Sequence, residues 1–135
     1  MKSLRVFLDA NILFSASLPR GTVVTLAEAL RLRHEAVTAQ LAIDEARRNL
    51  ARKQPQALSR LDAALIRVLI VSESDFIHGL ALPTNDGVLL GTAIATDCTH
   101  FLSGDKRHFG PLYGQTIQGV TILSPAMLLM HPDLF

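Results

Sequence analysis

Short apolar runs alternate with segments of helical periodicity along this chain of 135 residues. The apolar runs predict strands, and they lie at residues 4–8, 36–38, 68–71, 99–103 and 120–123. Strands that alternate with helices favour a mainly parallel sheet with helices on both faces. The sequence therefore predicts an α/β fold, a three-layer α/β/α sandwich with a mainly parallel central sheet.

The segments between these runs carry apolar residues three and four positions apart, which is typical of amphipathic helices. We expect helices at residues 23–30, 41–50, 58–65, 74–80 and 87–95, and a last one that begins at Pro125. The segment 87–95 is apolar or small on nearly every side, which predicts a buried helix with Asp86 as its N-cap.

The composition supports one hydrophobic core. Apolar residues make up 49% of the chain and aromatic residues only 5%, so Leu, Ile, Val and Ala must fill the core. A chain of this length buries roughly two thirds of the surface that its unfolded form exposes. Because no repeat, linker or low-complexity tract divides the sequence, we predict a single domain over residues 1–135.

Charge and cysteine content restrict the partners and the compartment. The formal net charge is +1, so attraction of a charged partner must be local. The single cysteine, Cys98, excludes an intramolecular disulfide and a cysteine-based zinc site, and we expect it to be a small buried side chain. Residues 1–8 are too short for a signal-peptide core, and no run approaches the roughly 18 apolar residues of a membrane span, so we expect a cytoplasmic protein.

Four acidic residues occupy positions that a parallel sheet would bring together. Asp9 ends the first strand, Asp105 follows the fourth, Asp86 precedes the buried helix, and Glu45 lies in the helix after the second strand. Ligands of open parallel sheets bind outside the carboxyl ends of the strands. Each acid has an ordinary alternative role, as a helix cap, a turn residue or exposed helix surface. Their joint arrangement favours a common site.

Carboxylates gathered in one place need a counter-charge. Each pair near 4 Å repels by about 4 kcal/mol at an effective dielectric constant near 20, so the group needs a cation or some members are protonated. Oxygen ligands with no cysteine or expected histidine among them suit Mg²⁺ or Mn²⁺ rather than Zn²⁺. These ions can activate water and neutralise charge on a phosphodiester, which indicates phosphate chemistry.

Four segments, in order, resemble the motifs of PIN-domain nucleases, including the toxin ribonucleases of VapC type. The resemblance spans nearly the whole chain and rests on residues 6–13, 43–50, Asp86 with 89–93, and 101–109. In the first segment an acid ends the strand and Asn11 follows two positions later. The last segment, Phe-Leu-Ser-Gly-Asp-Lys-Arg-His-Phe, is the most specific.

The resemblance implies a site, a reaction and partners. It implies that Asn11 and Ser103 support the site by hydrogen bonds, and that one or two Mg²⁺ or Mn²⁺ ions are held by the catalytic acids Asp9, Glu45, Asp86 and Asp105. The implied reaction is hydrolysis of RNA to a 5′-phosphate and a 3′-hydroxyl. The family's members often form homodimers, and a small antitoxin protein is a candidate partner.

The sequence departs from the family pattern or leaves it open at two places. Asp44 lies beside Glu45, and we prefer Glu45 because the motif places its acid next to a small apolar residue. Many members carry a further acid after the last one, where this chain has Lys106, Arg107 and His108, so we expect one ion rather than two. Lys106 and Arg107 adjoin the predicted site and could bind RNA phosphates.

Other basic residues have simpler explanations. The run of Arg47, Arg48, Arg52 and Lys53 is explained at least as well by a solvated helix face as by RNA binding. His34 and His100 fall in or near predicted elements and are expected to be structural. His108 could contact the substrate.

We therefore predict a Mg²⁺- or Mn²⁺-dependent endoribonuclease, with the toxin of a toxin–antitoxin pair as one biological role. A second hypothesis is phosphoryl transfer through an aspartyl intermediate at Asp9, which normally requires a second acid where this chain has Asn11. A third is a catalytically silent PIN-like domain that binds RNA or a protein. The complete set of acids argues against the third.

Overall fold

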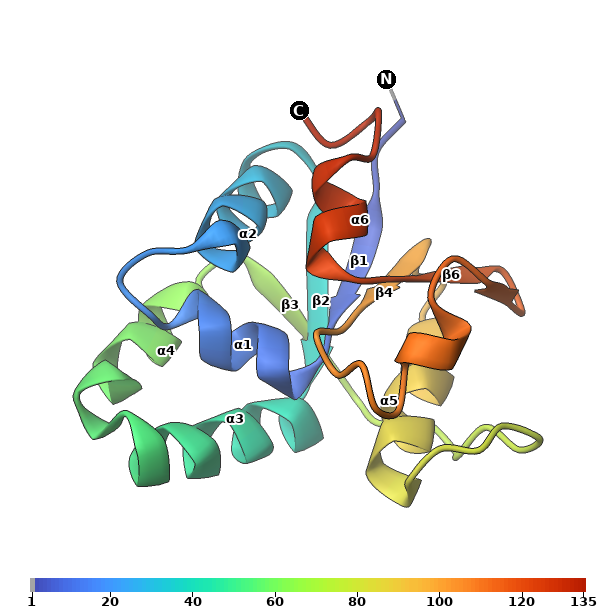
Figure 1. The fold of residues 1–135 in the computed structure, drawn as a ribbon, viewed down its shortest axis with the longest axis horizontal. Helices are drawn as coiled ribbons and strands as arrows, with labels where there is room; N and C mark the ends of the chain where they lie inside the picture. Colours follow the sequence, from blue (N-terminus) through green and yellow to red (C-terminus); the bar gives the residue numbers. More distant parts are fainter. Residues whose placement is uncertain (1) are drawn as a thin grey trace.

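The computed structural model of the chain describes residues 2–135, so Met1 of the predicted domain lies outside the described residues. Within that range the strands form one six-stranded sheet in the order β3-β2-β1-β4-β6-β5 (Figure 1). The strands are β1 (Arg5–Leu8), β2 (Glu35–Ala39), β3 (Val68–Val71), β4 (His100–Leu102), β5 (Thr116–Ile117) and β6 (Val120–Leu123). All neighbouring pairs are parallel except β5 and β6.

The helices cover both faces of this sheet and confirm the predicted three-layer α/β/α fold. They are α1 (Ala10–Ala16), α2 (Thr22–Arg33), α3 (Gln40–Lys53), α4 (Leu58–Ala64), α5 (Thr84–Ala95) and α6 (Pro125–Leu129), with short 3₁₀ turns at η1 (Pro55–Ala57) and η2 (Gly110–Leu112). In Figure 1, α2 and α6 lie on the viewer's side of the strands, and α2 contacts both α6 and β2. The helix α5 contacts β2 and β4. No helix among residues 2–135 has the length and hydropathy to cross a membrane.

The central strand β1 anchors the core and carries the first predicted site residue. Val6, Phe7 and Leu8 are almost completely buried, as expected for a parallel strand between two others. The Phe7 ring stacks on that of Phe101 in β4, with centroids 5.5 Å apart. Since β2, β1, β4 and β6 run in the same direction, their carboxyl ends meet at one edge of the sheet.

The structure differs from the sequence predictions at four places. The helix α1 and the edge strand β5 were not predicted. The helix α5 begins at Thr84, so Asp86 lies in its first turn and is not its N-cap. The helix predicted at residues 74–80 is wrong, because this segment is irregular, with a bend at residues 79–80.

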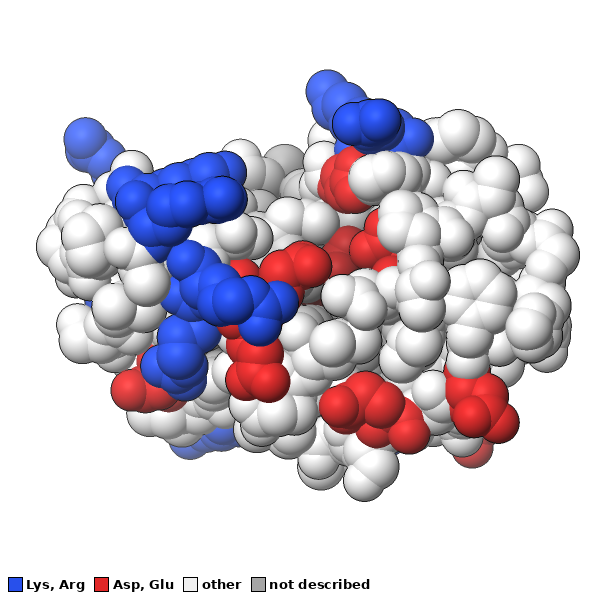
Figure 2. Space-filling view, turned by 90° about the horizontal axis from the view of Figure 1, so that it is seen from below, with Lys and Arg blue, Asp and Glu red and all other residues white. Residues whose placement is uncertain are grey.

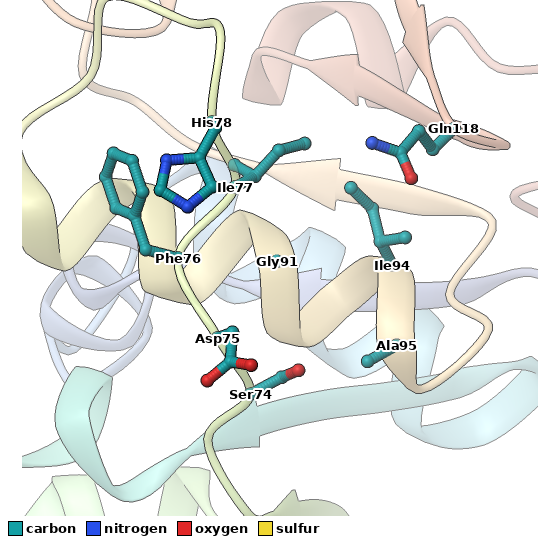
Figure 3. Close-up of a pocket in the computed structure, with 9 residues that line it drawn as sticks. All are labelled: Ser74, Asp75, Phe76, Ile77, His78, Gly91, Ile94, Ala95 and Gln118. Carbon is teal, nitrogen blue, oxygen red and sulfur yellow. The ribbon is translucent and has the colours of Figure 1, made fainter.

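The segment 72–83 forms neither helix nor strand, and part of its backbone bonds to α5. The backbone N–H of Ile77 donates to the carbonyl of Gly87 (3.2 Å), and that of Ser74 donates to the Thr92 hydroxyl (2.9 Å). Gly91 allows this close approach, since a β-carbon there would overlap the carbonyl oxygen of Asp75. Figure 3 shows the segment crossing α5 beside Gly91, where the two enclose part of a cavity of about 440 Å³.

Candidate functional site

The carboxyl end of β1 places Asp9 inside the protein. Its side chain is only 2% exposed, and its Oδ1 accepts a hydrogen bond from the backbone N–H of Ala10 (2.8 Å). Asp9 is therefore the N-cap of α1, the ordinary role weighed for it from the sequence. Capping uses one carboxylate oxygen and leaves Oδ2 for other partners.

The second oxygen of Asp9 is held by two polar side chains from separate parts of the sequence. The Ser103 hydroxyl donates to Oδ2 (2.7 Å), and so does the Asn11 amide (3.1 Å). Asn11 in turn accepts from the backbone N–H of Gly104 (2.7 Å), which ties the start of α1 to the loop after β4. Asn11 and Ser103 thus fix the orientation of the Asp9 carboxylate, and their support of a metal site stays a prediction.

Three further acids line a cavity of about 450 Å³; Asp9 is not part of its lining, but the charges of two of the three, Asp86 and Glu45, act on it. Glu45 from α3, Asp86 from the first turn of α5 and Asp105 from the loop after β4 all line the cavity. Asp44 does not, because it points outward and accepts a hydrogen bond from Gln40 on the same helix (2.8 Å). The fold therefore brings together the four acids chosen from the sequence and leaves Asp44 on the surface.

Burial and mutual repulsion favour the protonated forms of the two more buried acids. Burial raises the pKa of Asp9 to about 7, and the Asp86 and Glu45 carboxylates push it in the same direction, against the hydrogen bonds from Ser103 and Ala10. Burial also raises the pKa of Asp86, aided by Asp105 and Glu45 and opposed by His108. The fold thus concentrates negative charge at a place where water solvates it poorly.

The pKa of Asp105 shifts in the opposite direction, because hydrogen-bond donors contact its carboxylate. Burial acts to raise its pKa, but a hydrogen bond with the His108 side chain and backbone N–H donations from His108 and Arg107 outweigh this and lower it. Asp105 therefore carries a negative charge more readily than Asp9 or Asp86.

His108 enters the acid group, which the sequence prediction of an all-carboxylate site did not include. Its Nδ1 lies 2.7 Å from Asp105 Oδ2 and 3.6 Å from Asp86 Oδ2. One ligand atom from each of these three residues lies within 4.8 Å of the others. The sequence feature that could have indicated this contact is the spacing of three residues between Asp105 and His108, which allows side-chain contact in a helical turn.

The donor set fits a divalent cation. Carboxylate oxygens of Asp86 and Asp105 and an imidazole nitrogen of His108 come together, and Glu45 lines the same cavity. Oxygen and imidazole donors of this kind hold divalent ions in proteins. A cation would also neutralise the repulsion that raises the pKa of Asp9 and of Asp86.

Basic side chains flank the acidic hollow. Figure 2 shows acidic atoms in the middle of this face with groups of Lys and Arg on two sides. Lys106 and Arg107 are exposed directly after Asp105, and α3 carries Arg48 and Arg52 as exposed residues. The arrangement could hold an anionic chain across the hollow while a bound cation neutralises its centre.

The residues expected to be structural are buried or contact residues outside the acid group. Cys98 is buried, as predicted. The ring of His34 accepts a hydrogen bond from the backbone N–H of Leu4 (3.0 Å) and contacts the carbonyl of Leu134 (2.9 Å). His100 packs edge-on against His131, away from the acids. None of these three contributes to the lining of the acidic cavity.

No protein-family model and no curated protein matches the sequence. Solved structures do match the fold. A chain of the VapBC2 complex from Rickettsia felis, solved with a DNA fragment from its promoter, superposes with a TM-score of 0.65 at 18% identity, over 90% of this chain and 98% of that one. A chain of a toxin–antitoxin complex from Klebsiella pneumoniae gives a TM-score of 0.64 at 18% identity, over 86% and 95%. The chain therefore has the PIN-like α/β/α fold that its motifs implied, and shares it with chains of toxin–antitoxin complexes.

Proposed function

We propose that this protein is a divalent-metal-dependent endoribonuclease. The observation that carries the proposal is the gathering of four acids: Glu45, Asp86 and Asp105 line one cavity, and Asp9 is buried close enough for Asp86 and Glu45 to raise its pKa. Asp9 is almost fully buried there and is held by Asn11 and Ser103. A fold does not by itself need a buried carboxylate with three acidic neighbours, since such a group costs stability.

The residues of the site have distinct parts in the proposed reaction. Asp9, Glu45, Asp86 and Asp105 would hold the ion, and Asn11 and Ser103 would fix the direction of the Asp9 carboxylate. The bound Mg²⁺ or Mn²⁺ would supply an activated water and charge neutralisation at the phosphodiester. Before an ion binds, the acids repel an RNA phosphate, so the site can accept its substrate only in the loaded form.

The proposal is tested with purified protein and labelled single-stranded RNA. We expect cleavage with Mn²⁺ or Mg²⁺ at millimolar concentration, none with EDTA, and recovery when the ion is restored in excess. The products should carry 5′-phosphate and 3′-hydroxyl ends, which ligation and phosphatase treatment distinguish. A protein that binds the ion but cleaves none of a panel of structured and unstructured RNAs would instead be a silent binding domain.

We also propose a small antitoxin protein as partner, in a cytoplasmic toxin–antitoxin pair with this chain as a homodimer. The support is the fold shared with chains of two toxin–antitoxin complexes. Exposed apolar side chains offer surface for such contacts, among them Leu32 on α2, Ile66 after α4 and Phe135. A reading frame for a small protein next to the gene, whose product copurifies with this chain and blocks cleavage, is the expected finding.

Lys106 and Arg107 are proposed to bind the RNA backbone. Both are exposed beside Asp105. We expect the double change to Ala to weaken RNA binding and to make the negative slope of the logarithm of the binding constant against the logarithm of the salt concentration less steep, by about 0.7 for each phosphate that the variant no longer binds. Arg33→Ala is the matched control, because Arg33 ends α2 just before β2 begins, at the opposite edge of the sheet. Equal effects of the two changes would contradict the assignment.

A further inference from the structure

We propose that His108 is a direct metal ligand through Nδ1, and that this nitrogen makes the site prefer Mn²⁺ to Mg²⁺. The inference rests on the proposed metal site and specifies its ligand set and its ion. It replaces the oxygen-only site predicted from the sequence, in which the two ions were equivalent.

The position of the ring supports ligation. His108 Nδ1 faces both acids, at 2.7 Å from Asp105 Oδ2 and 3.6 Å from Asp86 Oδ2. Adjacent ligands of a six-coordinate ion with bonds of about 2.1 Å lie about 3 Å apart, and opposite ones about 4 Å apart. The three ligand atoms lie within 4.8 Å of one another. An ion could therefore take the place of the proton between His108 and Asp105 with only small movements of the side chains.

A hydrogen bond and a buried aromatic side chain fix the turn that carries His108. The backbone N–H of His108 donates to Asp105 Oδ1 (3.2 Å), and the next residue, Phe109, is fully buried with its ring 4.8 Å from that of Phe101. The side chain of His108 is 34% exposed, so it contributes little to the core. Such a residue is held in place for a contact at the site and can be replaced without unfolding the protein.

The nitrogen distinguishes between the two ions. Mg²⁺ is small and hard and keeps oxygen ligands and water, whereas imidazole binds transition-metal ions more readily. The carboxylates keep the site suited to Mn²⁺, which accepts both kinds of donor. A site with His108 as a ligand should therefore gain affinity for Mn²⁺ and little for Mg²⁺.

The test compares wild type, His108→Gln and His78→Ala by calorimetric titration with each ion in the absence of RNA. His108→Gln keeps a polar side chain that can reach Asp105 but offers no imidazole. We expect it to weaken Mn²⁺ binding by about 10-fold or more, in the range found when groups around metals are altered, and to change Mg²⁺ binding by less than about 3-fold. His78 is exposed on the 72–83 segment beside the other cavity (Figure 3), so its change should alter neither.

A spectroscopic measurement provides a second readout. Pulsed electron paramagnetic resonance of the Mn²⁺-loaded wild type should show coupling to an imidazole nitrogen, and His108→Gln should lack it. Equal weakening of Mn²⁺ and Mg²⁺ binding in His108→Gln, or no nitrogen coupling in the wild type, would overturn the inference and leave the metal site standing. If the wild type binds neither ion at millimolar concentration, the proposed function itself fails.

Discussion

Asp9→Asn is expected to lower metal-dependent RNA cleavage by more than about 100-fold, beyond the loss typical for a residue that only supports a metal ligand. The change removes one carboxylate from the acid group and places an amide nitrogen against the donors of Asn11 and Ser103. Both effects act against a bound cation. The measurement is the rate of RNA cleavage at saturating Mn²⁺, together with the dissociation constant of the ion.

Two further variants separate loss of the site from loss of the fold. Asp105→Asn should have a similar effect on cleavage, and it is more exposed, so its thermal unfolding should change less than that of Asp9→Asn. Asp44→Asn is the matched control, because Asp44 is exposed next to Glu45 and outside the cavity. Full activity in either Asp9→Asn or Asp105→Asn, or loss of activity in Asp44→Asn, would refute the proposed ligand set.

The metal-free protein is expected to lose stability as the pH rises from about 4 to about 7. The pKa of Asp9 is about 7 in the folded protein, against about 3.9 for an unfolded aspartate. Below pH 4 both states are protonated and Asp9 costs nothing. Between these values the unfolded state releases the proton first, so unfolding becomes easier, and above pH 7 the loss is complete. Three pH units correspond to a loss of about 4 kcal/mol.

Divalent ions should reverse this loss above pH 7. An ion that binds the folded state alone adds about 2.7 kcal/mol of stability at 100 times its dissociation constant. The measurement is thermal unfolding from pH 4 to pH 8, once with EDTA and once with Mn²⁺. The raised pKa of Asp86 acts in the same direction as that of Asp9, and the lowered pKa values of Asp105 and His100 act in the opposite direction.

The contribution of Asp9 is therefore taken from the difference between wild type and Asp9→Asn. The stability of Asp9→Asn with EDTA should vary less between pH 4 and pH 7, because the group that binds the proton is gone. Parallel profiles for the two proteins would show that Asp9 is already ionised at low pH in the folded state. The electrostatic argument for a cation at this site would then lose its main support.

The sequence by itself determined five of the six strands and the positions of most of the acids. The apolar runs at 4–8, 36–38, 68–71, 99–103 and 120–123 each coincide with an observed strand, and β2 extends one residue beyond its run at each end. Burial on both faces of a parallel strand requires such runs, so they are visible without knowledge of the neighbours. The acids at the ends of β1 and β4 follow directly, because the chain must leave the sheet there.

The local sequence pattern gave wrong predictions where tertiary contacts determine the backbone conformation. Residues 74–80 carry Phe76, Ile77 and Leu80 at helical spacing, yet their backbone bonds to α5, and Gly91 makes room for them. The start of α5 likewise lies at Thr84, before the acid that looked like its cap. Tertiary contacts override helix propensity in such places, because hydrogen bonds to another element replace those that a helix would form within the segment.

Only the tertiary structure decided which side chains share the site. Asp44 and Glu45 are neighbours in sequence, but successive residues of a helix point about 100° apart, and the packing of α3 turns Glu45 toward Asp86 and Asp105. His108 joins them because the turn after β4 brings its ring back over Asp105. The sequence determines which residues are able to bind an ion. Which of them come close enough to share one depends on interatomic distances, and these are set by the packing of elements that lie far apart in the chain.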